Sequence, residues 1–397
     1  MSTIESIGTG GDYATPQDWY NAHAGNITSD VNAPYIGELT PEIFSGGLVM
    51  SGSTTDITHY FHLRAKTGSE FNGNFSGAYP EIRKTSGDDI VKITDNYTRL
   101  EHFCVGNTTN RHNGIFVDSV NHIIIDACGV HNMDYNNDII DGAIHVEGDS
   151  TNVVIRNCAV GSLSTDGAAG AVSGIYIEGT GSGTCELYNN TVNQLNCGSV
   201  VGTAYGIIVG DQLTAKIINN VIGVISAPNA KASIYTTGIG TLTNIYNGGE
   251  NATGLGSASV SGWSSANVFV NSTDTNAMDL HLKPGQPGNV GAAGANPLRQ
   301  AGLNLRKSSL YISTPTYDID NDVRGVNVPW NMGADGDAEG VTKGTSTTGM
   351  LCKKSDGTYT YAQWRLFYAQ CPKINSMCNA NSSGYVSASQ VCQLSLW

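Results

Sequence analysis

The chain has 397 residues, of which 49 are glycine, 14 % are charged and 40 % are hydrophobic, and its formal net charge is −14. This composition is typical of a folded, β-rich protein with many turns, and it excludes a disordered chain. The acidic balance argues against nucleic-acid binding, which needs a basic surface, and no apolar run approaches the ~20 residues of a membrane span, so we expect no membrane insertion.

Residues 1–60 are predicted to form an N-terminal cap with entry strands. Thr15 can serve as the N-cap of a helix, Pro16 as its first residue and Asp18 as the acceptor at its third position. This arrangement predicts a short helix over residues 16–23, which would cover the open apolar end of a stack of strands. The N-terminus has neither a basic n-region nor an apolar h-region, so we expect no Sec signal peptide.

Residues 61–300 contain a repeat with a period of about 30 residues. Two kinds of strand alternate along it, and they begin at Gly114, Ile125, Ala143, Ile155, Gly174, Leu187, Gly206 and Ile217. Within each strand apolar residues occupy every second position, which predicts β-structure. Repetition at a fixed length without helical stretches predicts a solenoid whose coils stack at about 4.8 Å.

Equivalent positions of stacked coils should form columns. An asparagine ladder is expected at Asn157, Asn189, Asn219 and Asn247, because asparagine tolerates a left-handed backbone and its amide can bond the next coil. Five cysteines lie in strand-like contexts and are predicted to be buried thiols, namely Cys104, Cys128, Cys158, Cys185 and Cys197.

These repeats resemble the right-handed parallel β-helix of the pectate-lyase-like superfamily. The resemblance implies an all-β fold with an N-terminal capping helix, to which the sequence adds a small Cys-containing C-terminal module. The superfamily includes lyases, hydrolases, esterases, epimerases and non-enzymatic virion proteins, so the architecture alone indicates no function. The chain lacks the Gln-Asp-Thr and Asp-Phe-x-Phe-Gly pair of pectin methylesterases and the Asn-Thr-Asp, Asp-Asp and Gly-His-Gly set of polygalacturonases. These absences disfavour both activities.

The outward positions of one strand type supply the candidate site. A column of rings is predicted at Phe116, His145 and Tyr176, which are the candidates for glycan binding. Beside it runs a carboxylate ladder, and the candidates for catalysis are Asp118, Glu147, Glu178 and His145. Neighbouring coils place carboxyl groups about 5 Å apart and second neighbours about 10 Å apart, which brackets the separations in retaining and inverting glycosidases. The alternative is a solvated sheet face on which three equivalent acids happen to stack.

Residues 301–340 are predicted to close the β-helix, because residues 317–325 and 331–335 resemble the closing segment of many bacterial and phage β-helix proteins. Within this segment Asp318, Asp320 and Asp322 alternate as in a calcium loop, which makes Ca²⁺ the candidate cation. The glycine and the distal glutamate of an EF-hand are absent, and a turn that satisfies its own backbone is the alternative. We expect no cofactor to be required.

Residues 341–397 form a linker followed by an appended module rich in aromatic residues and cysteine. Its four cysteines are Cys352, Cys371, Cys378 and Cys392, and they allow three disulfide pairings that the sequence does not distinguish. β-Helix virion proteins commonly form trimers, and Trp364, Phe367 and Tyr368 offer apolar surface for assembly, so the resemblance implies a homotrimer.

Two functions from different classes fit these features. The first is a bacteriophage virion structural protein of the tailspike, fibre or head-decoration type, which presents a rigid β-helix to a host surface glycan or to other virion proteins. The second is a polysaccharide lyase or glycoside hydrolase acting on that glycan. An acidic ladder has the wrong sign to bind a uronate unless a cation is present, so we favour the structural protein located in the virion. Whether the chain is an enzyme stays open.

Overall fold

The computed structural model describes residues 2–84, 89–109, 113–135, 140–165, 170–178, 183–198, 201–210, 214–238, 240–274, 277–283, 286–287, 290, 295–305, 317–320, 330–335, 351–353 and 359–361. The chain separates into two units, Met1–Gly340 and Val341–Trp397. Among the described residues, no helix has the length and apolar character needed to cross a membrane.

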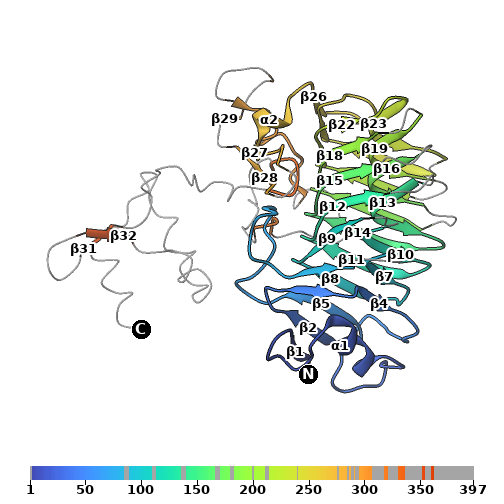
Figure 1. Ribbon diagram of the computed structural model, residues 1–397. Coiled ribbons are helices and arrows are strands. Elements are labelled where there is room, and N and C mark those ends of the chain that lie inside the picture. The colour runs from blue at the N-terminus through green and yellow to red at the C-terminus, as the bar shows by residue number, and fades with distance from the viewer. Residues whose placement is uncertain are drawn as a thin grey trace. The chain divides into compact units, whose positions relative to one another are not determined.

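The first unit is a parallel β-helix of about seven turns, as the repeat predicts (Figure 1). Its strands form three parallel sheets, and each coil visits sheets I, II and III in that order. Sheet I contains β1 (Thr3–Ile7), β2 (Tyr35–Leu39), β5 (Phe61–Ala65), β8 (Thr98–Glu101), β11 (Asn121–Asp126), β14 (Thr151–Arg156), β17 (Thr184–Tyr188), β20 (Thr214–Ile218) and β24 (Thr241–Ile245). The first coils therefore lie within residues 1–60, the region expected to contain the cap and entry strands.

The other two sheets complete each coil. Sheet II contains β3 (Ile43–Ser45), β6 (Glu81–Arg83), β9 (Cys104–Thr109), β12 (Gly129–Tyr135), β15 (Ala159–Thr165), β18 (Thr191–Cys197), β21 (Val221–Ile222), β22 (Ile225–Ser226), β25 (Gly248–Gly249) and β26 (Val260–Ser261). Sheet III contains β4 (Leu48–Met50), β7 (Val91–Ile93), β10 (Ile115–Asp118), β13 (Ile140–Glu147), β16 (Ala171–Ile177), β19 (Thr203–Val209) and β23 (Ala230–Thr236).

Aliphatic side chains fill the interior of the coils. In sheet I the inward positions Ile125, Ile155, Leu187 and Ile217 stack in register, and each is fully buried. Burying one such side chain stabilises the fold by about 1.5–3 kcal/mol relative to leaving it exposed. The five cysteines predicted to be buried thiols are buried and free, which confirms that prediction.

The turn from sheet I to sheet II carries the predicted asparagine ladder. Asn157, Asn189 and Asn219 have φ values of 54°, 53° and 62°, so they occupy the left-handed conformation that asparagine tolerates. The prediction for Asn247 was wrong by one position. Strand β24 pairs Ile245 with Ile218 rather than with Ile217, so Asn247 falls in the neighbouring column.

That neighbouring column forms a second, fully buried ladder. Asn190 Nδ2 donates to Asn220 Oδ1 at 2.9 Å, and Asn220 Nδ2 donates to Asn247 Oδ1 at 3.1 Å. Each amide also donates to a main-chain carbonyl, as Asn220 Nδ2 does to Leu187 O at 3.0 Å. The side chains therefore bond successive coils together along the helix axis, in addition to the main-chain ladders.

The predicted capping helix is present as α1 (Pro16–His23). Thr15 Oγ1 accepts a hydrogen bond from Asp18 N at 3.1 Å, and Pro16 occupies the start of the helix, as expected. Trp19 and Tyr20 are buried, with ring centroids 5.8 and 5.2 Å from that of Phe61 in β5. The helix thus covers apolar side chains of the first coils.

The segment after β26 folds back along sheet II rather than continuing the stack. It contains α2 (Ser265–Val268), β27 (Phe269–Asn271), β28 (Asp279–Leu282), β29 (Gln286–Pro287) and β30 (Ala295–Asn296). Phe75 N donates to Met278 O at 2.8 Å, and Ala334 N donates to Thr191 Oγ1 at 2.9 Å. Figure 1 shows β27 and β28 beside the strands of sheet II. The expected closing segment therefore lies along the side of the coils.

The second unit contains the antiparallel pair β31 (Leu351–Lys353) and β32 (Tyr359–Tyr361). Cys352 lies in β31. The remaining residues of the predicted module, including Cys371, Cys378, Cys392, Trp364, Phe367 and Tyr368, lie outside the described residues.

Candidate functional site

The outer face of sheet III brings the six predicted site residues together. His145 in β13 pairs with Phe116 in β10 and with Tyr176 in β16. Two positions further along each strand, Asp118 pairs with Glu147, and Glu178 follows β16 directly. The two columns are therefore adjacent and in register along the helix axis, as the repeat predicts.

The rings of the first column pack against each other. The His145 ring lies stacked on Tyr176, with centroids 4.5 Å apart and planes 14° apart, and meets Phe116 edge-on at 5.4 Å. Phe116 and His145 are only 7 % and 6 % exposed, whereas Tyr176 is half-buried. Tyr176 is therefore the ring of the three that offers most surface to a ligand. Lys92 Nζ lies 5.0 Å from the centroid of Phe116.

A chain of hydrogen bonds orients the His145 imidazole. Asn113 Nδ2 donates to Asp89 Oδ1 at 2.9 Å, which turns Asn113 Oδ1 toward His145 Nδ1 at 3.1 Å. Gly142 N donates to the same Asn113 oxygen at 3.1 Å. Because Asn113 Oδ1 can only accept, Nδ1 carries the proton and Nε2 keeps its lone pair. Burial lowers the pKa of His145 to about 4, so the ring is neutral at pH 7.

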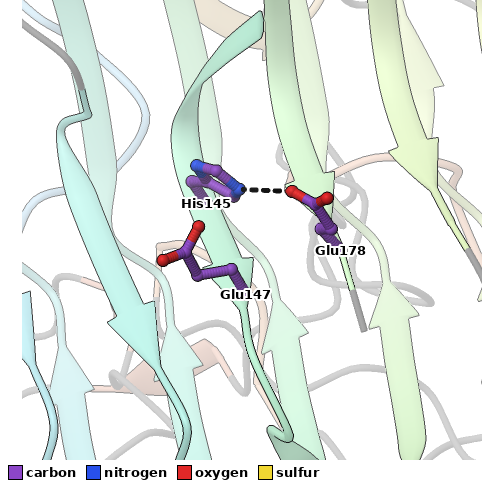
Figure 2. A group of neighbouring side chains, drawn as sticks. All are labelled: His145, Glu147 and Glu178. Atoms are coloured by element: carbon purple, nitrogen blue, oxygen red, sulfur yellow. Dashed lines mark ion pairs between the residues drawn. The ribbon is translucent and has the colours of Figure 1, made fainter. Parts of the chain in front are cut away.

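Two carboxylates face His145 Nε2 (Figure 2). Glu178 Oε2 lies 3.8 Å from Nε2, and one oxygen each of Glu147 and Glu178 lies within 4.8 Å of Nε2 and of the other. Burial raises the pKa of Glu147, and the charges of Asp118 and Glu178 raise it further. The Glu178 side chain is 52 % exposed. The acids therefore occupy different environments, unlike the three equivalent acids of the alternative interpretation of this face.

The predicted calcium segment is organised around a histidine. Asp322 lies outside the described residues, while Asp318 and Asp320 gather with Asp335 so that one oxygen of each lies within 4.8 Å of the others. His281 in β28 bonds Asp320 Oδ1 through Nε2 at 3.1 Å and bonds Asp279 through Nδ1.

Burial disfavours the charged ring of His281, but the hydrogen bonds to Asp279 and Asp320 outweigh it and raise the pKa to about 11. A protonated histidine therefore already supplies positive charge beside these carboxylates. Calcium binding at this segment stays a prediction.

Sequence reasoning missed a buried ion pair on the outer side of sheet II. Arg83 donates to both oxygens of Glu81 at 2.8 Å, and His131 Nε2 lies 3.3 Å from Glu81 Oε1. Glu81 and His131 are each 4 % exposed and line a groove of about 470 Å³ together with Phe75. The sequence separates Glu81 from His131 by two coils, and no motif joins them.

A second groove that the sequence did not indicate lies on the outer face of sheet I. Its volume is about 370 Å³, and its lining includes Tyr60, Tyr97, Arg99 and His122. The rings of Tyr97 and His122 are stacked with centroids 4.7 Å apart, and the Arg99 guanidinium lies 5.8 Å from the centroid of Tyr60. Both residues of the stacked pair have positive φ; Tyr97 lies just before β8 and His122 lies near the start of β11, at positions that the repeat pattern does not mark as functional.

No family model matches the chain, and no curated protein matches it. Among solved structures, the chain is similar to two crystal structures of the pectin methylesterase from Aspergillus niger, in deglycosylated and penultimately deglycosylated forms. Identity is 10 % in both, the alignments cover 59 % and 58 % of this chain and 84 % of the esterase, and the TM-scores are 0.30 and 0.31. Similarity at this level indicates no activity, and the β-helix assignment rests on the sheet pairing of the chain itself.

Proposed function

We propose that the protein binds a polysaccharide along the outer face of sheet III. The observation that supports this proposal is the in-register pair of columns, rings beside carboxylates, that the stacked strands hold in fixed positions. Binding sites for small polar molecules combine apolar surface with a few oriented polar groups, and this face has both. Because the columns repeat along the helix axis, the ligand best matched to them is itself a repeating chain.

Tyr176 and Tyr235 supply the accessible apolar surface. They lie in the same column, on either side of Ile208, and Tyr235 is 43 % exposed. Two coil spacings of about 4.8 Å separate them, so they lie roughly 10 Å apart along the axis. The flat apolar face of a sugar ring can pack on such a side chain, while the hydroxyl groups donate hydrogen bonds to Glu147 and Glu178.

A specific observation favours a second candidate, retaining glycoside hydrolysis. The oxygens of Glu147 and Glu178 approach within 4.8 Å, close to the roughly 5–5.5 Å between the two carboxyl groups of retaining enzymes. The raised pKa of Glu147 suits a general acid, and the exposed Glu178 suits a nucleophile. The location in a virion, the homotrimer and the partnership with other virion proteins stay predictions from the sequence.

A glycan array tests the first candidate, and assays for reducing ends released from the glycans that the protein binds on the array test the second. We expect binding that Tyr176→Ala weakens at least about tenfold, since the variant removes the accessible ring. Asp134→Asn, on the outer side of sheet II, is the charge-matched control for Glu147→Gln and Glu178→Gln and should behave like the wild type. Unchanged binding by Tyr176→Ala, or no glycan retained at all, would contradict the proposal. Release of reducing ends that both Glu147→Gln and Glu178→Gln abolish would establish the hydrolase instead.

A further inference from the structure

We propose that His145, Glu147 and Glu178 form a binding site for a divalent metal ion of the zinc type. The assignment goes beyond glycan binding and does not depend on it. It rests on three features of the outer face of sheet III: a buried imidazole nitrogen without a partner, hydrogen bonds that orient it, and two carboxylates that converge on it (Figure 2).

His145 Nε2 is the unusual atom. The side chain is 7 % exposed, and Nε2 has no hydrogen-bond partner among the described residues. A buried polar atom left without a hydrogen-bond partner destabilises the fold, so folded proteins retain few of them. Figure 2 shows Nε2 directed toward Glu178, with the Glu147 carboxylate below the imidazole ring in this view. A bound cation would satisfy this nitrogen.

The opposite edge of the ring is held as metal-bound histidines are held. A histidine ligand usually donates its other ring N–H to a carbonyl or carboxylate, which sets the tautomer and the ring orientation. Here Asn113 Oδ1 accepts from Nδ1, and Asp89 fixes the Asn113 amide in turn. Stacking on Tyr176 fixes the plane of the ring. The lone pair of Nε2 is therefore oriented before any ion arrives.

The distances suit a small cation after modest movements of the two glutamate side chains. Tetrahedral zinc with bonds of about 2.0–2.2 Å places its ligand atoms roughly 3.4 Å apart. Nε2 and Glu178 Oε2 are 3.8 Å apart, and all three ligand atoms lie within 4.8 Å of one another. Glu178 is half-exposed at the end of β16, so its side chain can close the remaining distance.

The ligand set selects the type of ion. One imidazole and two carboxylates match the nitrogen and oxygen ligands of zinc and related metals, whereas Ca²⁺ takes six to eight oxygens. Three protein ligands leave at least one coordination position for water or for an oxygen of another molecule. An ion would also hold Glu147 deprotonated, which excludes its use as a general acid.

Calorimetric titration of ZnCl₂ into the full-length protein tests the site, with no glycan present, so the result is independent of the proposed function. Glu178→Gln and His145→Phe each remove a ligand; the phenylalanine keeps the ring stacking, and Asn113 Oδ1 keeps its bond from Gly142 N. Asp134→Asn, on the outer side of sheet II, is the matched control, because it removes a carboxylate away from the site.

We expect the wild type and Asp134→Asn each to bind one equivalent of zinc. Both ligand variants should lose this binding or bind zinc roughly a hundredfold more weakly. Because the Glu178 side chain is half-exposed, Glu178→Gln should fold even if His145→Phe does not. In that case the zinc titration of Glu178→Gln alone decides the outcome. Ca²⁺ should bind at least about tenfold more weakly than Zn²⁺. Identical zinc titrations of wild type and Glu178→Gln, or equal affinity for Ca²⁺, would overturn the assignment.

Discussion

The inner asparagine ladder should carry a large share of the stability of the coils, and Asn220→Ala tests it. The Asn220 side chain is 1 % exposed; its Nδ2 donates to Asn247 Oδ1 and to Leu187 O, and its Oδ1 accepts from both Asn190 N and Asn190 Nδ2. Truncation leaves the Asn190 main-chain N–H without its acceptor and removes one bond from the Leu187 carbonyl.

Each buried group left without a partner costs about 1–3 kcal/mol, so the free energy of unfolding should fall by about 2–4 kcal/mol. Urea unfolding followed by circular dichroism measures this change. Asn229→Ala is the control, because that exposed amide makes one bond, to Val201 O at 3.3 Å, and its loss should change stability by less than about 0.5 kcal/mol. A loss for Asn220→Ala no larger than that of the control would refute the structural role assigned to the ladder.

Three further predictions concern stability. Burial opposes ionisation of Glu101, but the hydrogen bond from His62 lowers the carboxyl pKa to about 2. The ionised carboxylate therefore stabilises the fold at pH values above its ordinary pKa, and this stabilisation is lost as the pH falls toward 2. Glu101→Gln should reduce the acid sensitivity of unfolding. Because the pKa of His281 is raised to about 11, the protonated ring stabilises the fold fully below about pH 6.5, and this stabilisation is lost as the pH rises toward 11. The melting temperatures of His281→Gln at pH 6 and pH 10 should therefore differ less than those of the wild type. Gly174→Ala would place its Cβ 2.7 Å from a carbonyl oxygen of the next coil and should lower the urea midpoint clearly. Among the described residues, a Cβ at Gly210 meets no atom closer than 3.6 Å, so Gly210→Ala should be nearly neutral; similar midpoints for the two variants would contradict the packing described.

Much of the architecture could be predicted because the same residue pattern recurs in successive coils of a solenoid. Ile125, Ile155 and Leu187 occupy equivalent positions, so periodicity alone aligned the coils, and Thr15 with Pro16 marked the capping helix. The error at Asn247 arose where a coil is one residue out of step, because pattern alignment assumes equal spacing and only the strand pairing reveals the shift.

The candidate site could be predicted only in part. The columns followed from the repeat, but the burial of His145 and the unequal environments of the acids did not, because they depend on ring packing and on Asn113, a residue outside the repeat motif. The pairing of His281 with Asp320 joins segments 39 residues apart and could not be read from either alone.

A crystal structure of the protein with an oligosaccharide that it binds on the array tests most directly whether the outer face of sheet III binds the glycan. We predict density for a sugar chain along the helix axis, with a ring packed on Tyr176 and hydroxyl groups within hydrogen-bond distance of Glu147 or Glu178. Density in the groove beside Tyr97 on sheet I, or in the groove beside Phe75 on sheet II, with sheet III empty, would contradict it.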